Sequence, residues 1–181
     1  MKTAMHTMAA ATVICAGEEH IAAISRLAGV IWRECYPDII SPAQIDYMLA
    51  RMYAADVLRA EMRGGIRYHC LMLEGGLGGF AACGPLAEPA VFKLHKLYLL
   101  PTWHGRGFGS LLLLHCERDS RERGARRLVL NVNKKNTKAI RAYERNGFAV
   151  WESVVADIGG GFVMDDYVMS KDLAPVTDAG R

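Results

Sequence analysis

Glycines that precede a helix could hold an anion, and this chain has three of them in alternate positions. They are Gly105, Gly107 and Gly109, directly before a leucine-rich segment that is predicted to be helical. Because glycine has no Cβ, backbone amides there can approach a ligand closely, and the unpaired N–H groups at a helix start attract negative charge. Arg106 would add charge-assisted hydrogen bonds. The pattern therefore favours a phosphate site over a tight turn, for which one glycine would be enough.

Two common nucleotide-binding motifs do not fit this loop. The dinucleotide fingerprint needs glycines at its first, third and sixth positions, and counting from Gly105 the sixth position is Ser110. The P-loop pattern GxxxxGK[ST] does not occur in the chain. The stretch HGRGFGSLLL instead resembles the acetyl-CoA pyrophosphate loop of the GNAT superfamily of N-acetyltransferases, Gln/Arg-x-x-Gly-x-Gly/Ala, with His104 in place of the usual first residue. The resemblance implies that a run of consecutive residues binds acetyl-CoA: His104, Gly105, Arg106, Gly107, Phe108, Gly109 and Ser110.

A second segment, NTKAIRAYERNGF (136–148), resembles the family's Asn-x-x-Ala-x-x-x-Tyr-x-x-x-Gly-Phe motif. Asn136 and Tyr143 are two helical turns apart and therefore project from one face of the expected helix. A tyrosine stays protonated at neutral pH because its ordinary pKa is about 10, so a phenol near a thioester sulfur can donate a proton to the leaving thiolate. The resemblance implies this general-acid role for Tyr143 and contact of both residues with the cofactor. Without it, Tyr143 would be interpreted as a packing residue and Asn136 as a helix cap.

The strand before the glycine loop also matches the family, at Leu97, Tyr98 and Leu99. The resemblance implies that the main chain there pairs with the pantetheine arm of acetyl-CoA as an added strand would. It also implies that an amide near Leu99 polarises the thioester carbonyl. Backbone pairing leaves the identity of the side chains free to vary.

Transfer to an amine also requires a group that removes a proton from the acceptor. An amine like that of lysine has a pKa of about 10.4, so neutralising it at pH 7 costs about 4–5 kcal/mol, and a base or a path of ordered water must take the proton. His95 is one candidate for a catalytic base, and strand alternation predicts that it shares a face with Lys93 and Leu97. The neighbours Asp165 and Asp166 are the other candidates, and a purely structural role for His95 stays open.

The residues that would contact the acceptor are the least determined part of the sequence. Trp32, Tyr36 and Asp165 are the candidates for substrate binding, since the early helices usually form part of the acceptor wall in the superfamily. A carboxylate beside the pocket would attract a cationic amine, which favours a small amine or polyamine. A protein N-terminus or lysine side chain, held in an open groove, is an alternative peptide acceptor. A non-catalytic acyl-CoA-binding module with a regulatory role is another.

Composition limits the remaining classes of function. The net charge of +3 over 181 residues is too small to indicate a protein that binds nucleic acid. No apolar stretch approaches the ~20 residues needed to cross a bilayer. The five cysteines are widely spaced and form no CxxC pair, which argues against a disulfide framework and against a zinc site. We therefore expect a cytoplasmic protein that binds no metal, nucleic acid or membrane. A homodimer is compatible with the resemblance, because dimers are common in the family.

Apolar spacing and turn residues predict the elements that must position these groups. Gly124 and Gly147 are expected to end helices as left-handed residues. Helices are expected at 18–35, 42–49, 56–63, 109–123 and 136–146. Strands are expected at 12–16, 68–74, 77–84, 90–100, 128–132, 148–157 and 162–171.

Helices at the start of the chain and hairpins between the later elements indicate a mixed sheet rather than a purely parallel one. The fold class is therefore α+β (mixed α/β), with a GNAT-type single domain. Its twisted, mostly antiparallel sheet would have about six to seven strands and about four flanking helices. The N-acetyltransferase domain is expected at 12–173, between a flexible leader at 1–11 and a flexible tail at 174–181.

Overall fold

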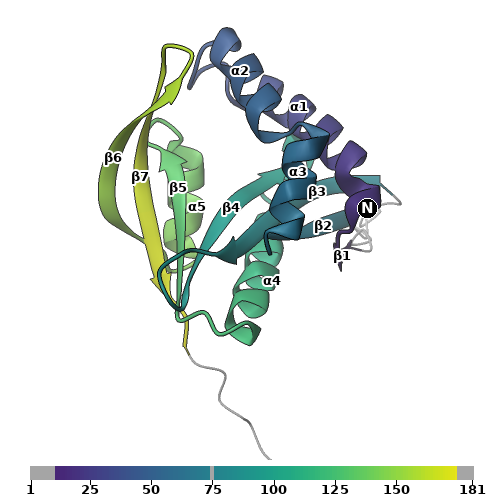
Figure 1. Cartoon of the computed structure of the whole chain (residues 1–181), viewed down its shortest axis with the longest axis vertical. Coiled ribbons are helices and arrows are strands. Elements are labelled where there is room, and N and C mark those ends of the chain that lie inside the picture. The colour runs from purple at the N-terminus through teal and green to yellow at the C-terminus, as the bar shows by residue number, and fades with distance from the viewer. Residues whose placement is uncertain (1–10, 74–75, 175–181) are drawn as a thin grey trace, which may run out of the picture.

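A computed structural model describes residues 11–73 and 76–174 (Figure 1). Seven strands form one sheet in the order β1-β2-β3-β4-β5-β7-β6, and of these neighbouring pairs β4–β5 is parallel and the others are antiparallel. The strands are β1 (Ala11–Cys15), β2 (Arg67–Leu73), β3 (Gly76–Pro85), β4 (Val91–Leu99), β5 (Arg127–Asn133), β6 (Ala149–Gly159) and β7 (Phe162–Asp172). The helices are α1 (Ile21–Cys35), α2 (Pro42–Met52), α3 (Ala55–Arg63), α4 (Phe108–Glu122) and α5 (Thr137–Arg145), with short 3-10 helices η1 (Glu18–His20) and η2 (Pro101–Trp103). The expected mixed, mostly antiparallel α+β fold is confirmed.

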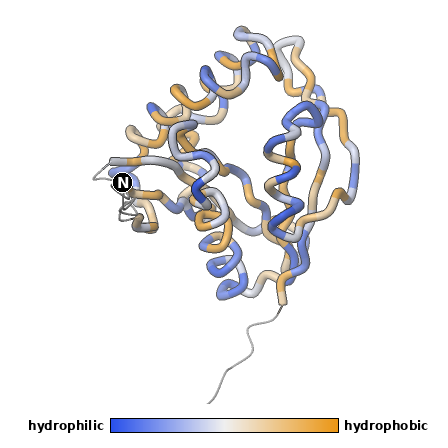
Figure 2. The backbone as a smooth tube through the Cα atoms, turned by 180° about the vertical axis from the view of Figure 1, so that it is seen from behind, coloured by the Kyte–Doolittle hydropathy of each residue, from blue (hydrophilic) through white to orange (hydrophobic). Residues whose placement is uncertain are grey.

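Helices cover both faces of the sheet, and each face has its own core. Helices α1, α2 and α3 pack on one face, around the buried side chains of Tyr68 and Phe80. Helices α4 and α5 pack on the other face, where Leu112 and Leu130 are buried. Hydrophobic and hydrophilic residues alternate along these helices (Figure 2), as expected for helices that bury one side against a sheet.

The predicted elements lie close to the observed ones. The predicted helix 18–35 begins with the turn η1, so its α-helical part starts at Ile21, and α2 extends to Met52 beyond its predicted end at 49. Five α-helices flank the sheet where about four were expected. Residue 74 of the predicted second strand, the leader up to residue 10 and the tail from residue 175 lie outside the described residues. Ala11, placed in the expected leader, begins β1.

The two parallel strands at the centre of the sheet pair along only part of their length. Residues Val91–Leu94 of β4 pair with Arg127–Leu130 of β5, and no pairing between these strands continues beyond Leu94 in the described chain. Figure 1 shows the strands diverging from there. The end of β4, up to Leu99, is therefore paired with β3 on one side and has its other edge free of β5.

A β-bulge interrupts β4 next to this divergence. Cys83 of β3 faces Leu94 and Ala82 faces Lys96, so His95 is the extra residue on β4. Side-chain alternation fails here, because Leu94 and Leu97 both pack on the face covered by α4. The expectation that His95 shares a face with Leu97 is therefore wrong, since it assumed a regular strand.

No helix in the described part of the chain combines the length and the apolar character needed to cross a bilayer.

Candidate acetyl-CoA site

The glycine loop lies between η2 and α4, and its backbone requires glycine. Gly105 and Gly107 have φ angles of 75° and 82°, in the left-handed region, and Gly107 is the N-cap residue of α4. A Cβ added at Gly105, Gly107 or Gly109 would meet no other atom within 4 Å. The loop thus places the first amides of a 15-residue helix beside open space. An anion could approach these N–H groups directly.

The other side chains of the loop pack against one another or reach back to the sheet. The guanidinium of Arg106 lies 4.9 Å from the centre of the Trp103 ring, and Trp103 contacts Phe108 edge to face at 5.9 Å. His104 Nε2 lies 2.9 Å from the carbonyl oxygen of Leu99 and donates a hydrogen bond to it. His104 therefore fixes the start of the loop to the end of β4.

Helix α5 carries the second motif and is capped as expected. The backbone N–H of Ala139 donates to Asn136 Oδ1 at 3.1 Å, which confirms Asn136 as the N-cap. At the other end, Gly147 has a φ of 86°. Asn146 Nδ2 donates to Ser110 Oγ at 3.1 Å and so joins the end of α5 to the first turn of α4. The two motifs are therefore in direct contact.

Tyr143 projects from α5 into the core beneath α4. Its ring meets Phe148 at a tilted angle, with 5.9 Å between the ring centres. Burial, and then the neighbouring Cys116, raise the pKa of the Tyr143 phenol. Tyr143 in turn contributes to raising the pKa of Tyr36 and of Tyr98, behind burial as the largest cause for each. These three phenols, from α5, the end of α1 and β4, therefore lie near one another and stay protonated at neutral pH.

The aromatic residues expected at the acceptor site occupy different depths of the fold. Trp32 is buried, stacks on Tyr36 with 4.6 Å between ring centres, and has no hydrogen-bond partner for Nε1 among the described residues. Tyr36 lies at the end of α1, also 6.5 Å from the ring of Tyr98. Trp32 thus supports Tyr36 from inside the core, and Tyr36 extends toward the end of β4.

Polar groups on β4 and β7 were expected to supply a base. Burial, followed by Lys93 and Lys96, lowers the pKa of His95 to about 4, and its buried Nε2 has no partner in the described chain. Asp166 on β7 is buried, and burial raises its pKa against the opposing effect of Lys93. Asp165 on the adjacent position is exposed and pairs with Lys134.

A buried ion pair beneath the site was not anticipated from the sequence. Lys96 Nζ lies 2.7 and 2.6 Å from the two carboxylate oxygens of Glu61 on α3, and its side chain is 1% exposed. Tyr68 donates a hydrogen bond to Glu61, and the rings of Tyr53 and Tyr68 lie 5.5 Å from the ammonium. A lysine in an apolar strand indicates that its ammonium group is paired with a carboxylate. The sequence does not show which acidic residue provides that carboxylate.

One cavity opens where the α1–α2 connection meets the β6–β7 hairpin. It has a volume of about 360 Å³. Asp165, an expected substrate-binding residue, lines it. The other lining residues are Ile39, Ile40, Ser41, Gln44, Asn133, Lys135 and Val163. The cavity therefore has apolar, amide and charged groups of both signs on its walls.

The family model that matches this chain is that of the acetyltransferase (GNAT) family, over residues 24–148. A spermidine N(1)-acetyltransferase of Thermoplasma acidophilum is 24% identical over 152 residues, which cover 81% of this chain and 91% of that protein. A streptothricin acetyltransferase of Streptomyces lavendulae is 40% identical over 76 residues, 42% of this chain. The chain spans 40% of the length of that streptothricin acetyltransferase. It spans 51% of an uncharacterized N-acetyltransferase of Mycobacterium bovis, at 37% identity over 81 residues.

Among solved structures, the PaiA N-acetyltransferase of T. acidophilum in complex with coenzyme A resembles the chain with a TM-score of 0.76. The likeness covers 90% of this chain and 99% of that one, at 23% identity. At that identity the likeness concerns the fold. Because the family model spans more than half of the sequence and includes both the glycine loop and the α5 motif, the chain belongs to the GNAT family of acetyltransferases.

Proposed function

We propose that this protein transfers the acetyl group of acetyl-CoA directly to a primary amine. The observation that carries the proposal is the glycine loop, whose amides at the start of α4 stand beside open space. The loop follows the end of β4, whose edge beyond Leu94 is free of β5, and this order suits a ligand with a diphosphate and an extended arm. In this proposal the main chain of Leu97–Leu99 pairs with that arm.

Tyr143 is the proposed general acid. The amine attacks the thioester carbonyl, the carbon–sulfur bond breaks, and the phenol gives its proton to the departing thiolate of coenzyme A. Burial raises the pKa of this phenol, so Tyr143 is protonated at neutral pH and carries the proton that the role requires. The reaction needs no acyl-enzyme intermediate, so the cysteines have no part in it.

We infer that His95 accepts the proton that the amine nitrogen loses, through water. A bound ammonium ion cannot give its proton to a group whose pKa is about 4 without a large cost. The nitrogen becomes much more acidic after it has attacked the carbonyl, so transfer to His95 fits that later stage. The position of His95 on the bulge beside the free edge of β4 supports this order.

A small amine or polyamine is the acceptor class that we favour. The cavity beside the α1–α2 connection has the carboxylate of Asp165 on its wall, where a cationic amine would compete with Lys134 for it. A relative over 81% of the chain is named a spermidine acetyltransferase, which agrees with this class. Tyr36, supported by Trp32, would form the wall nearest the thioester.

Release of free thiol from acetyl-CoA tests the proposal across a panel of polyamines, amino-group antibiotics and peptides with free N-termini. We expect turnover with at least one small amine and little with peptides. Turnover with peptides alone would favour a protein acetyltransferase. Tight binding of acetyl-CoA without acceptor-dependent thiol release over the whole panel would favour the non-catalytic module and overturn the proposed reaction.

A methyl group at Gly107 should weaken cofactor binding. Alanine at this left-handed position costs about 1–2 kcal/mol of folding stability. It also disturbs amides that would bind the diphosphate, at about 1.5–3 kcal/mol for a hydrogen bond to a charged group. We therefore expect Gly107→Ala to raise the Kd for acetyl-CoA by about 10–100-fold, measured by calorimetry.

Gly124 provides a matched control, since it has a φ of 90° at the far end of α4 and no atom within 4 Å of an added Cβ. Gly124→Ala should lose a similar amount of stability and keep its affinity for acetyl-CoA. If the two variants bind acetyl-CoA with equal affinity, the glycine loop is not part of the binding site.

The role of His95 predicts an unusual pH dependence. Because burial and the two lysines lower its pKa to about 4, its imidazole is neutral and able to accept a proton at any pH well above 4. The ratio of kcat of the wild type to that of His95→Gln should therefore stay constant from pH 7 to about 5 and fall toward one near pH 4. Circular dichroism at each pH checks that both proteins remain folded. A ratio of one throughout, or a ratio that falls through pH 6.5, would contradict the assignment.

A further inference from the structure

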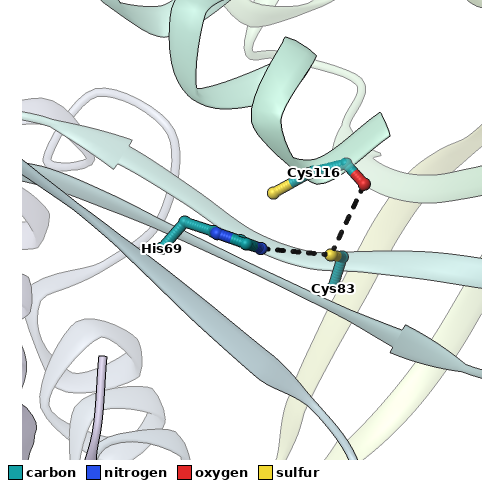
Figure 3. Close-up of side chains that lie close together, drawn as sticks. All are labelled: His69, Cys83 and Cys116. Carbon is teal, nitrogen blue, oxygen red and sulfur yellow. Dashed lines mark hydrogen bonds between the residues drawn. The ribbon is translucent and has the colours of Figure 1, made fainter. Parts of the chain in front are cut away.

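Three side chains with metal-binding atoms converge on the face of the sheet covered by α4, away from the cavity beside α2. They are His69 of β2, Cys83 of β3 and Cys116 of α4, all buried (Figure 3). Their ligand atoms, one imidazole nitrogen and two sulfurs, lie within 4.8 Å of one another. Cys83 Sγ lies 3.9 Å from His69 Nε2.

These distances are near those of a tetrahedral zinc site. Zinc binds sulfur at about 2.3 Å and imidazole nitrogen at about 2.0–2.1 Å, so its ligand atoms lie roughly 3.4–3.8 Å apart. The three atoms would therefore need to draw together by about 1 Å or less, which a change in side-chain torsions supplies. Two sulfurs and one imidazole favour zinc over calcium or magnesium, which prefer oxygen ligands.

Asp119 offers a candidate fourth ligand atom, close to two of the three residues. Asp119 Oδ2, one turn along α4 from Cys116, lies 3.7 Å from Cys83 Sγ and 4.0 Å from His69 Nε2. Arg67 and Arg123 hold this carboxylate at 2.6 and 3.1 Å. Outer partners of this kind fix the orientation of a metal ligand.

We propose that His69, Cys83, Cys116 and Asp119 form a structural zinc site that ties α4 to β2 and β3. Zinc binding would release the thiol protons of the two cysteines to solvent as the metal–sulfur bonds form. One member, Cys116, neighbours Tyr143. The proposal uses no step of the acetyl transfer, however, and it stands whether or not the protein acetylates an amine.

Two further observations agree with a site that binds a small ion. The hydroxyl oxygen of Ser120, next to Asp119 on α4, is buried and has no hydrogen-bond partner in the described chain. A cavity of about 160 Å³ reaches His69 and Asp119 from the surface, where Cys15 and His115 also line it. An ion could enter by this route.

Sequence patterns do not reveal this site because its members come from distant positions. Cys83 and Cys116 belong to different elements and lack the CxxC spacing that marks most zinc sites. The expectation of no zinc site used the odd number of cysteines, their wide spacing and the lack of a CxxC pair. The fold brings the residues together through the pairing of β2 with β3 and the packing of α4 on both.

Cobalt(II) is the probe that tests the proposal on the intact protein. Metal-free, reduced protein is titrated with Co²⁺, and absorption in the near ultraviolet reports bonds between thiolates and cobalt. We expect one equivalent of tightly bound Co²⁺ with thiolate absorption, displaced by Zn²⁺, and an increase in Tm on addition of Zn²⁺ that a chelator reverses.

The variants Cys83→Ser and Cys116→Ser should each lose the band. Cys70→Ser and Cys35→Ser change cysteines that pack on the opposite face of the sheet, and both variants should keep the band. Retention of the band in Cys83→Ser, or no stoichiometric Co²⁺ binding by the wild type, would overturn the proposal. A disulfide between Cys83 and Cys116 in protein purified without added reductant, resistant to later reduction, would overturn it as well. If the serine variants do not fold, the titration and Tm of the wild type decide the question.

Discussion

Replacement of Tyr143 by phenylalanine is expected to lower kcat by roughly 10²–10⁴-fold, the contribution of a general acid. The KM for acetyl-CoA should change little, because the glycine loop and the edge of β4 are unaffected. The ring stays in its contact with Phe148, so packing is preserved and only the proton donor is lost. Steady-state kinetics with both substrates saturating measure this split.

Tyr167→Phe is the matched control, since Tyr167 packs on the same face of the sheet from β7 and has no proposed role in the reaction. Its turnover should equal that of the wild type. The pKa of Tyr143 is raised above the ordinary tyrosine value of about 10. Loss of its proton should therefore not lower the rate of the wild type at any pH below about 10. Undiminished turnover of Tyr143→Phe would exclude it as the acid.

The second large effect is expected in stability, from the buried ion pair. Glu61→Gln removes the charge that compensates Lys96, and the free energy of unfolding should fall by about 3–5 kcal/mol, as when one member of a buried pair is lost. Burial already lowers the pKa of Lys96, and Glu61 opposes that effect. In the variant the pKa of Lys96 falls further below its ordinary value. Between that lowered pKa and about 10, the unfolded chain binds more protons than the folded one, so the stability of Glu61→Gln should rise with pH over that interval, as urea unfolding at several pH values would show.

The double variant Glu61→Gln/Lys96→Met separates the pair from the packing. With both charges gone, most of the lost stability should return, because a buried pair is often no better than apolar side chains of similar volume. The exposed pair between Arg59 and Glu18, at 2.9 Å, is the control, and Arg59→Ala should cost no more than about 1 kcal/mol. A double variant as unstable as Glu61→Gln would show that the charge was not the cause.

Much of the fold could be predicted because local signals agreed with the final structure. Asn136 caps α5, and Gly124 and Gly147 take left-handed angles at the ends of α4 and α5. The loop of alternating glycines is another case in which residue type alone indicates backbone geometry. These features depend on a few neighbouring residues, and such signals are readable in the sequence.

What could not be predicted depends on contacts between distant parts of the chain. The bulge at His95 is set by the register of β4 against β3. A prediction that assumes a regular strand places His95 on the same face of the sheet as Leu97, which is wrong. The partner of Lys96 comes from α3, and the meeting of His69, Cys83 and Cys116 requires the packing of α4 on two strands. None of these pairs has a sequence spacing that distinguishes it from other pairs of the same residue types.

The hydrogen bond from Asn146 to Ser110 joins the end of α5 to the first turn of α4. The larger cavity is lined by the α1–α2 connection, by β7 and by Asn133 and Lys135, and it includes neither end of that contact. Under the proposed function, a library confined to the α1–α2 connection and β7 would therefore vary the acceptor wall while leaving the joint between the two motif helices intact.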